Sequence, residues 1–348
     1  MKVIENTAVE SRPIKWILDE FRKGNLYIDD SFQRNYVWLN KDRISLIETV
    51  LLGYSIPEIY LWETDTNAKT GDTRYSIIDG QQRIRTINQF VDGNLKLTDS
   101  GLEFKKADYR GKEFDSLIDS HKKDFWSYKV SVRFVNKNVG RDDIIKMFLR
   151  LNKTSNALNP QELRHAEFHG QFISASFEIA SLPHWREWGT FTDLEIRRMS
   201  DIQFASTLII YIRSGFEDET TQSSINKFYD LLNEKYPDKK HDITATIKTL
   251  DDIRKYTAES PALKSALQKK THAYTIFTLT NHLMNIKHPT SGIGKTLEAW
   301  YEWHDKKAAP PNEFKDLVAE YRRLTAEGVQ KKANRQKRFE ILCTYLKV

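Results

Sequence analysis

The stretch YSIIDGQQRIRTINQF, residues 75–90, changes from apolar to polar in its middle. Its first four residues are typical of a short buried strand, and residues 81–91 have the apolar spacing of a helix. A helix that starts directly after a buried strand points unsatisfied backbone N–H groups past the strand end, where they attract phosphate. Asp79 is suited to capping this helix, and Gly80 would let a ligand approach the backbone closely. The stretch therefore predicts an anion-binding corner between a strand and a helix.

The side chains that open this helix fit the same interpretation. Arg83 and Arg85 add positive charge, and a guanidinium can hold two phosphate oxygens at once. Gln81 and Gln82 carry both donors and acceptors, which suits orienting a water molecule or a ribose. The alternative is a capped helix whose arginines form surface ion pairs, because short Gly-containing motifs recur by chance.

Length and composition favour a two-domain protein of the cytoplasm. At 348 residues the chain exceeds the size at which one core keeps growing, and 39% hydrophobic residues suffice for packed cores. No apolar run approaches the roughly 20 residues of a membrane span, and the N-terminal residues lack the apolar stretch of a signal peptide. The single cysteine, Cys343, excludes an intrachain disulfide and a Cys-rich zinc site and fits a reducing compartment.

The order of the predicted elements indicates an α+β fold with a helical second half. Strands are predicted at 26–28, 58–63, 74–78 and 128–135, and helices between them at 42–54, 81–91 and 142–152. Further along, the segments that suit helices are 197–213, 224–236, 242–257, 261–287, 293–304, 313–326 and 330–346. The sequence therefore predicts an α+β domain over residues 1–182 and a helical domain over residues 183–348.

A second polar segment, SFQRNYVW at residues 31–38, places a guanidinium among aromatic side chains. A buried charge without a partner is costly, so Arg34 is expected to emerge from an apolar wall to meet an anion. The alternative is an internal carboxylate partner such as Asp79.

A third segment, FLRLNKTSNALNPQELRHAEFHG, spans residues 148–170. Its NPQE sequence predicts a helix start, with Asn159 as the cap, Pro160 in the first helical position and Glu162 closing a capping box. Asn152 is expected to end the preceding helix.

The same segment also contains candidate metal ligands. Glu162, His165 and His169 are spaced to share one helix face, as metal ligands do in some helical bundles. No further ligand at matching spacing completes such a set, so no metal centre is predicted. Arg164 is the better candidate for a functional residue than either histidine.

The sequence KKANRQKR, residues 331–338, gathers five basic residues in eight positions. Basic side chains near the start of a helix oppose its dipole, so an anion such as DNA could compensate them. The candidate DNA contacts are Lys331, Lys332, Arg335, Lys337 and Arg338. The alternative is a solvated charge run.

Three of these segments together resemble a known family. DGQQR at 79–83, FQRNYVW at 32–38 and FLRLN…LNPQELRHAEF at 148–168 resemble the N-terminal domain of GmrSD-type modification-dependent restriction enzymes, a DGQQR-motif family that includes SspE. The resemblance covers roughly residues 10 to 180. It implies a ParB/sulfiredoxin-like fold that binds and hydrolyses nucleoside triphosphates, with Mg²⁺, in bacterial defence against modified phage DNA.

The resemblance also implies roles for single residues. Asp79, Gly80, Gln81, Gln82 and Arg83 would form the nucleotide-hydrolysis motif. Arg34 would contact phosphate, and Asn152, Glu162 and Arg164 would form a second cluster of the family pattern.

Two departures from the family pattern bear on function. The sequence LNPQELRHA also resembles the stretch after the Glu-Asn pair of ParB CTP switches, but Leu151 stands where those proteins place the Glu. Full-length GmrSD fusions continue into an HNH-like nuclease domain, whose His-containing signature is lacking here. Cleavage of DNA would then need a separate nuclease subunit.

The leading hypothesis is an NTP-hydrolysing subunit of a defence system that acts on DNA. The competing hypothesis is a ParB-like DNA or nucleotide sensor that never hydrolyses its ligand and recruits a nuclease partner. A third hypothesis, direct nicking of DNA by the helical half, is supported only by the net charge of +6. The preferred base, the DNA modification and the formation of a homo-oligomer stay open.

Overall fold

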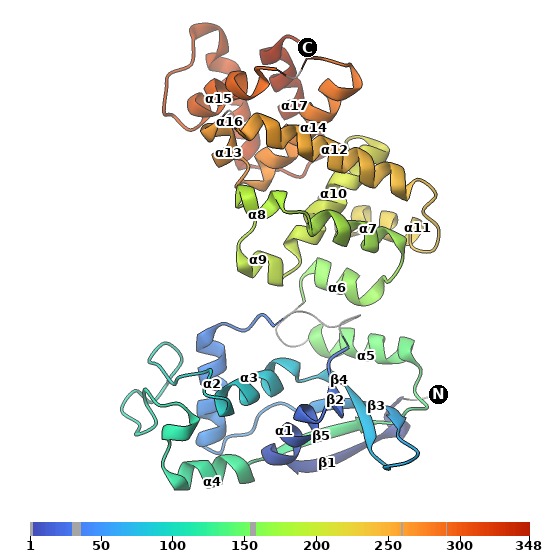
Figure 1. Ribbon diagram of the computed structural model, residues 1–348, viewed down its shortest axis with the longest axis vertical. Helices are drawn as coiled ribbons and strands as arrows, with labels where there is room; N and C mark the ends of the chain where they lie inside the picture. Colours follow the sequence, from blue (N-terminus) through green and yellow to red (C-terminus); the bar gives the residue numbers. More distant parts are fainter. Residues whose placement is uncertain (1–2, 30–35, 154–157, 259, 290) are drawn as a thin grey trace. The chain divides into compact units, whose positions relative to one another are not determined.

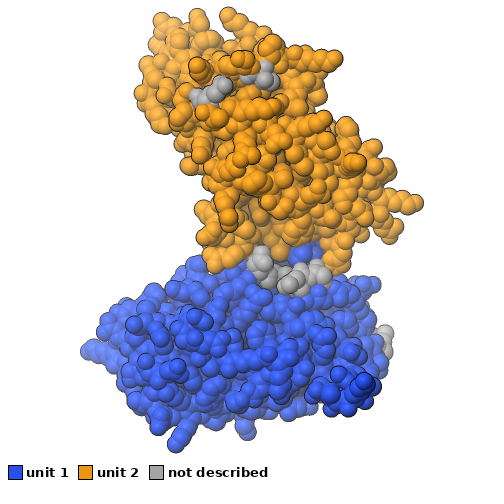
Figure 2. Space-filling model, in the orientation of Figure 1, with its two compact units in different colours: residues 1–167 blue, residues 168–348 orange. Residues whose placement is uncertain are grey.

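The computed structural model describes residues 3–29, 36–153, 158–258, 260–289 and 291–348. Two compact units make up the chain, Met1–Glu167 and Phe168–Val348 (Figure 2). The division falls before the predicted boundary at 182/183. The reason is that helix α7 (Gln171–Ala180) buries Phe172, Ile173 and Ile179 in the core of the second unit, where it packs on α10 (Ser200–Ser214).

Unit 1 is built on a five-stranded mixed sheet. Its strands are β1 (Thr7–Pro13), β2 (Leu26–Tyr27), β3 (Ile59–Thr66), β4 (Thr73–Asp79) and β5 (Lys129–Val135), in the order β1-β5-β3-β4-β2. Neighbours β1 and β5 are antiparallel, as are β3 and β4, whereas β3 runs parallel to β5 and β2 parallel to β4. Because β2 and β4 are parallel, their carboxyl ends meet at the same edge of the sheet.

Both faces of this sheet are covered by helices (Figure 1). The helical elements of unit 1 are η1 (Val3–Asn6), α1 (Ile14–Arg22), α2 (Asn40–Leu51), α3 (Gln81–Val91), η2 (Phe114–Ser116), α4 (Asp119–Ser127), α5 (Arg141–Lys153) and α6 (Pro160–Glu167). Ile77 packs in a cluster with apolar residues of α1, α2, α3 and α4, whereas Ile78 packs with Phe148 of α5 and Ala166 of α6. Successive strand residues point to opposite faces, so the run of adjacent isoleucines fits a strand buried on both sides.

The secondary-structure elements of unit 2 that the structure describes are all helices, joined by turns and loops. Its elements are α7, α8 (His184–Trp188), α9 (Asp193–Arg197), α10, α11 (Gln222–Leu231), α12 (Lys239–Ala258), α13 (Pro261–Ala266), α14 (Lys270–Asn285), α15 (Ile293–His304), η3 (Asn312–Phe314), α16 (Lys315–Ala326) and α17 (Lys332–Leu346). One apolar cluster runs from Phe168 to Cys343 through these helices. The predicted α+β class is confirmed. Among the described residues, no helix has the length and apolar character needed to cross a membrane.

A buried carboxylate ties a long loop of unit 1 to α2. Glu48 is 3% exposed, and its side chain accepts hydrogen bonds from the backbone N–H groups of Glu103 (2.7 Å) and Phe104 (3.0 Å) and from the Tyr109 hydroxyl (3.1 Å). A buried charge is tolerated when hydrogen bonds surround it in this way.

The substitution Glu48→Ala is expected to lower the free energy of unfolding of unit 1 by roughly 3 kcal/mol, because it leaves buried donors without an acceptor. Urea denaturation with hydrogen exchange read by mass spectrometry separates unit 1 from unit 2. Glu103→Ala, at an exposed position of the same loop, is the control and should change little. Equal stability of the two variants would contradict the role of Glu48.

Two histidines of unit 2 pack against each other and against tyrosines, His272 fully buried and His304 partly buried. His272 is 2% exposed and its ring centroid lies 4.6 Å from that of His304. Burial, followed by the nearby His304, lowers the pKa of His272 to about 3, and burial also lowers the pKa of His304. A group with a lowered pKa in the folded state contributes stability above its unfolded pKa of 6.5 and loses it as the pH falls towards 3.

Unit 2 should therefore lose about 2 kcal/mol of stability for His272 alone between pH 6.5 and about pH 5. His272→Asn is expected to flatten this pH dependence, whatever it does to stability at neutral pH. His241→Asn, at a side chain that is 77% exposed, is the matched control. Unfolding measured by urea at each pH tests this, and an unchanged slope in His272→Asn would contradict it.

Candidate functional site

The junction between β4 and α3 is a tight corner made by one glycine. Gly80 has φ +108° and is the residue that precedes the first turn of α3. A Cβ on Gly80 would lie 3.0 Å from a side-chain carbon of Ile59 and 3.4 Å from Nη2 of Arg83. The left-handed backbone favours glycine here, and the short distance to Ile59 adds to this preference. The expected capping by Asp79 is wrong, since Gly80 is the N-cap and no side chain caps the helix.

The Asp79 carboxylate instead binds the guanidinium of Arg83. Nη2 of Arg83 donates to Oδ2 of Asp79 (2.7 Å) and to the backbone carbonyl of Glu58 (2.9 Å). The side chain of Arg83 is 12% exposed and that of Asp79 is 32% exposed. The alternative interpretation from the sequence, an arginine held in an ion pair, therefore applies to Arg83.

This ion pair uses only part of the guanidinium. Nε of Arg83 is buried and has no hydrogen-bond partner among the described residues. Oδ1 of Asp79 likewise accepts no hydrogen bond from them. A buried donor without a partner costs free energy, and such atoms are few in native proteins. The junction thus holds an unused donor and an unused acceptor close together.

Glu58 forms the wall next to this junction. Its carboxylate accepts hydrogen bonds from the Ser131 hydroxyl (2.9 Å) and from Nε of Arg133 (3.2 Å). Burial opposes ionisation of Glu58, but these two hydrogen bonds outweigh it and lower its pKa. The charge of Glu58 is therefore matched by Arg133, which leaves Arg83 with Asp79 as its carboxylate partner.

Gln82 holds the chain that leads into α2. Its side-chain oxygen accepts hydrogen bonds from the backbone N–H groups of Val37 (3.0 Å) and Trp38 (3.3 Å). The carboxyl end of β2 lies at the same edge of the sheet as Asp79, because β2 and β4 are parallel neighbours. Arg34, the predicted phosphate contact, lies outside the described residues.

Arg85 lies on a different side of α3 from Arg83, since residues two apart on a helix do not face each other. It is half-buried and makes no hydrogen bond or ion pair with any residue that the structure describes. Its charge acts on Tyr36, whose hydroxyl contacts Thr86 at 2.7 Å. Burial raises the pKa of Tyr36, and the charges of Arg43 and Arg85 partly offset this.

Arg43 was missed by the sequence analysis. It bonds to side-chain oxygens of Gln89 and Asn40 and has no carboxylate partner among the described residues. Its guanidinium carbon lies 5.7 Å from the centre of the Tyr36 ring. Arg43 and Arg85 thus add two unneutralised charges beside Tyr36. The signal in the sequence was the motif FQRNYVW, which ends at the start of the helix that carries Arg43.

The predicted second cluster lies on the other face of β4. The expected helix start is present: the Asn159 side chain accepts from the N–H groups of Gln161 and Glu162 (both 2.9 Å), and Glu162 accepts from the Asn159 N–H (2.7 Å). Arg164 is 1% exposed and donates from Nε to the Gln161 side chain (2.9 Å). Both Glu162 and Arg164 are therefore buried side chains.

Asn152 lies inside α5 and does not end it. Its amide donates to the carbonyl of Phe148 (2.8 Å), one turn earlier in the helix. Phe148 shares an apolar cluster with Ile78, the residue before Asp79. The structure therefore brings α5 and α6 against the end of β4 that carries the DGQQR motif. Helix α6 ends at Glu167, so His169 is not on the same helix as Glu162 and His165.

The basic run at 331–338 divides into exposed and buried residues. Lys331, Lys332 and Lys337 are exposed. Arg335 and Arg338 are 6% and 1% exposed and lie inside unit 2. Only the three lysines of the run are therefore placed to meet DNA at the surface.

One comparison with known proteins gives a match, and it covers most of unit 1. Residues 14–169 match the family model described as "GmrSD restriction endonuclease, N-terminal domain". No curated protein and no solved structure gives a significant match. The matched range includes β2 to β5, the corner at Gly80 and helices α1 to α6. Over residues 14–169, this chain is therefore similar to the N-terminal domain of GmrSD-type restriction endonucleases.

Proposed function

We propose that this chain is an NTP-binding and NTP-hydrolysing subunit of a bacterial restriction-type defence system that acts on DNA. The observation that carries the proposal is the half-used guanidinium of Arg83 at the Gly80 corner, with a buried Nε that has no partner among the described residues. The family match of unit 1 to a restriction endonuclease domain supplies the biological context.

The charges around α3 support a polyanionic ligand. The N-terminus of α3 carries a partial positive charge and has no side-chain cap. Arg83 can turn its free edge to phosphate oxygens while Asp79 holds its other edge. Arg85 and Arg43 add charges that no described carboxylate neutralises. Arg34 is proposed as a further phosphate contact.

The hydrogen bonds narrow the choice of residue that positions the attacking water. The side-chain oxygen of Gln82 accepts hydrogen bonds from the backbone N–H groups of Val37 and Trp38, so its role is structural. Oδ1 of Asp79 accepts no hydrogen bond from the residues that the structure describes. We therefore assign the water to Asp79 or Gln81, with Arg83 offsetting the charge that develops on phosphoryl transfer.

The remaining parts of the proposal follow from the family. The triphosphate would enter with Mg²⁺, which commonly binds through phosphate oxygens and only one or two carboxylates. Asn152, Glu162 and Arg164 would support the nucleotide from the other face of β4 within a ParB/sulfiredoxin-like fold. Cleavage of DNA would fall to a separate nuclease subunit, and Lys331, Lys332 and Lys337 are the surface residues proposed to contact DNA.

A second candidate is a ParB-like sensor that binds NTP and recruits a nuclease without hydrolysis. The observation that favours it is the Asp79–Arg83 ion pair itself, since it engages one oxygen of the carboxylate that would have to orient the attacking water. Leu151, in place of a family Glu, points the same way.

Asp79→Ala and Arg83→Ala are each expected to reduce NTP turnover roughly 100-fold or more, because each removes a group that acts on the reacting phosphate or water. Phosphate release is measured for all four nucleotides, with circular dichroism to verify folding. Asp19→Ala, which breaks a surface (i, i+4) ion pair with Lys15 on α1, is the matched control. Undiminished hydrolysis by both site variants would exclude this site.

Calorimetry separates the two candidates. The hydrolase predicts NTP binding together with phosphate release, with modified DNA changing the rate. The sensor predicts binding that Arg83→Ala abolishes, without phosphate release even when DNA is present. Arg83→Lys keeps the charge but loses the planar fork, and is expected to weaken binding about tenfold in either case.

A further inference from the structure

Unit 2 contains a partly open cavity of about 310 Å³ between α10, α14 and the start of α17. Cavities of this size are at the low end of those that bind small molecules. Eleven described residues line it, and none of them is Asp or Glu. The lining includes three cations, Lys270, Arg335 and Arg338, and two aromatic rings, Phe204 and Tyr274.

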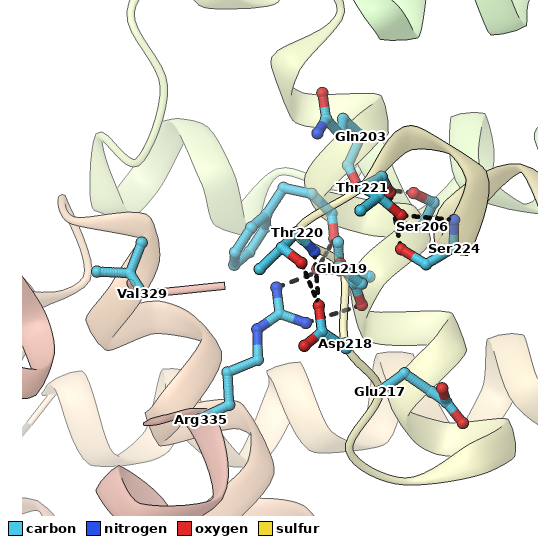
Figure 3. Close-up of polar contacts among 12 residues, drawn as sticks. Gln203, Ser206, Glu217, Asp218, Glu219, Thr220, Thr221, Ser224, Val329 and Arg335 are labelled. Carbon is cyan, nitrogen blue, oxygen red and sulfur yellow. Dashed lines mark hydrogen bonds and ion pairs between the residues drawn. The ribbon is translucent and has the colours of Figure 1, made fainter. Parts of the chain in front are cut away.

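One of these cations has a carboxylate partner. Nη2 of Arg335 donates to Oε2 of Glu219 (3.2 Å), and both side chains are buried. Nη1 of Arg335 lies 2.8 Å from Oε1 of Glu219 but makes no hydrogen bond with any residue that the structure describes. Figure 3 shows its guanidinium pointing towards the segment that carries Glu219. The guanidinium carbon also lies 4.2 Å from the centre of the Tyr274 ring. Glu219 therefore neutralises Arg335.

The second arginine has no such partner. Arg338 is 1% exposed and donates to the Thr275 hydroxyl (3.1 Å) and to the carbonyls of Leu324 (3.0 Å) and Val329 (2.9 Å). No carboxylate among the described residues pairs with it. Burial lowers the pKa of Arg338, and the neighbouring charge of Arg335 adds to this. The wall of the cavity thus carries a buried positive charge without a counter-ion, which is costly.

An unused donor lies on the same wall. Tyr274 is 3% exposed, and its hydroxyl has no hydrogen-bond partner among the described residues. A buried hydroxyl without a partner costs free energy that an acceptor in the cavity would recover. Lys270 brings a third cation and is paired with Glu195 at 2.6 Å.

We propose that this cavity binds a small organic molecule that carries one oxyanion, a carboxylate or a phosphate monoester. The oxyanion compensates Arg338 and accepts a hydrogen bond from Tyr274. The rings of Phe204 and Tyr274 contact its apolar part. This site is within unit 2 and does not depend on NTP binding by unit 1.

The test uses three probes that share one ring: phenyl phosphate, benzoate and the neutral phenol, each titrated into the full chain by calorimetry. At least one of the two anions is expected to bind at a single site at millimolar concentration or below, and phenol is not. The anion that binds more tightly identifies which oxyanion the cavity takes.

Tyr274→Phe removes only the unpartnered hydroxyl, so the protein is expected to fold as well as the wild type. It should weaken binding of the anion roughly tenfold. Tyr256→Phe is the matched control, because the Tyr256 hydroxyl is also buried without a described partner but does not line the cavity. Absence of binding by both anions, equal binding of phenol, or an affinity that Tyr274→Phe leaves unchanged would overturn the proposal.

Discussion

The left-handed turn at Gly80 fixes the geometry on which the candidate site depends. Its φ of +108° is strained for any residue with a Cβ, and that Cβ would also lie tightly against Ile59, at 3.0 Å. Because the chain turns so tightly, Gly80 is the only residue between the end of β4 at Asp79 and the first residue of α3, Gln81. Arg83 then reaches back to Asp79 and to the carbonyl of Glu58. One glycine thus brings a helix N-terminus, a carboxylate and a guanidinium to a single point at the sheet edge.

The sequence patterns that identified this point are those with a local cause. Adjacent isoleucines before an Asp-Gly pair predicted a strand buried on both faces, and the helix start at NPQE has both hydrogen bonds of a capping box. Strand β1 was not predicted. It lies at the edge of the sheet and its central residues are exposed, so its sequence lacks the alternation of apolar and polar residues that indicates a strand. The ion pair of Asp79 with Arg83 was not predicted either, since a carboxylate that precedes a helix can either cap the helix or form an ion pair.

Structural features that depend on contacts between residues far apart in the chain could not be predicted from the sequence. Arg335 and Arg338 belong to a basic run whose composition predicts an exposed segment. In the structure, both side chains lie on the face of α17 that is buried in unit 2. Their partners, Glu219 and Thr275, lie far away along the chain. The place of α7 in unit 2 has the same origin, because its apolar face fits α10 rather than the sheet.

The central claim is that the corner at Gly80 holds the phosphates of a nucleotide. Hydrogen exchange with and without a non-hydrolysable NTP analogue tests it most directly, because the N–H groups of this corner would be covered by the ligand. The account predicts slowed exchange in residues 80–86, which Arg83→Ala removes. Binding of the analogue with unchanged exchange in residues 80–86 would contradict it.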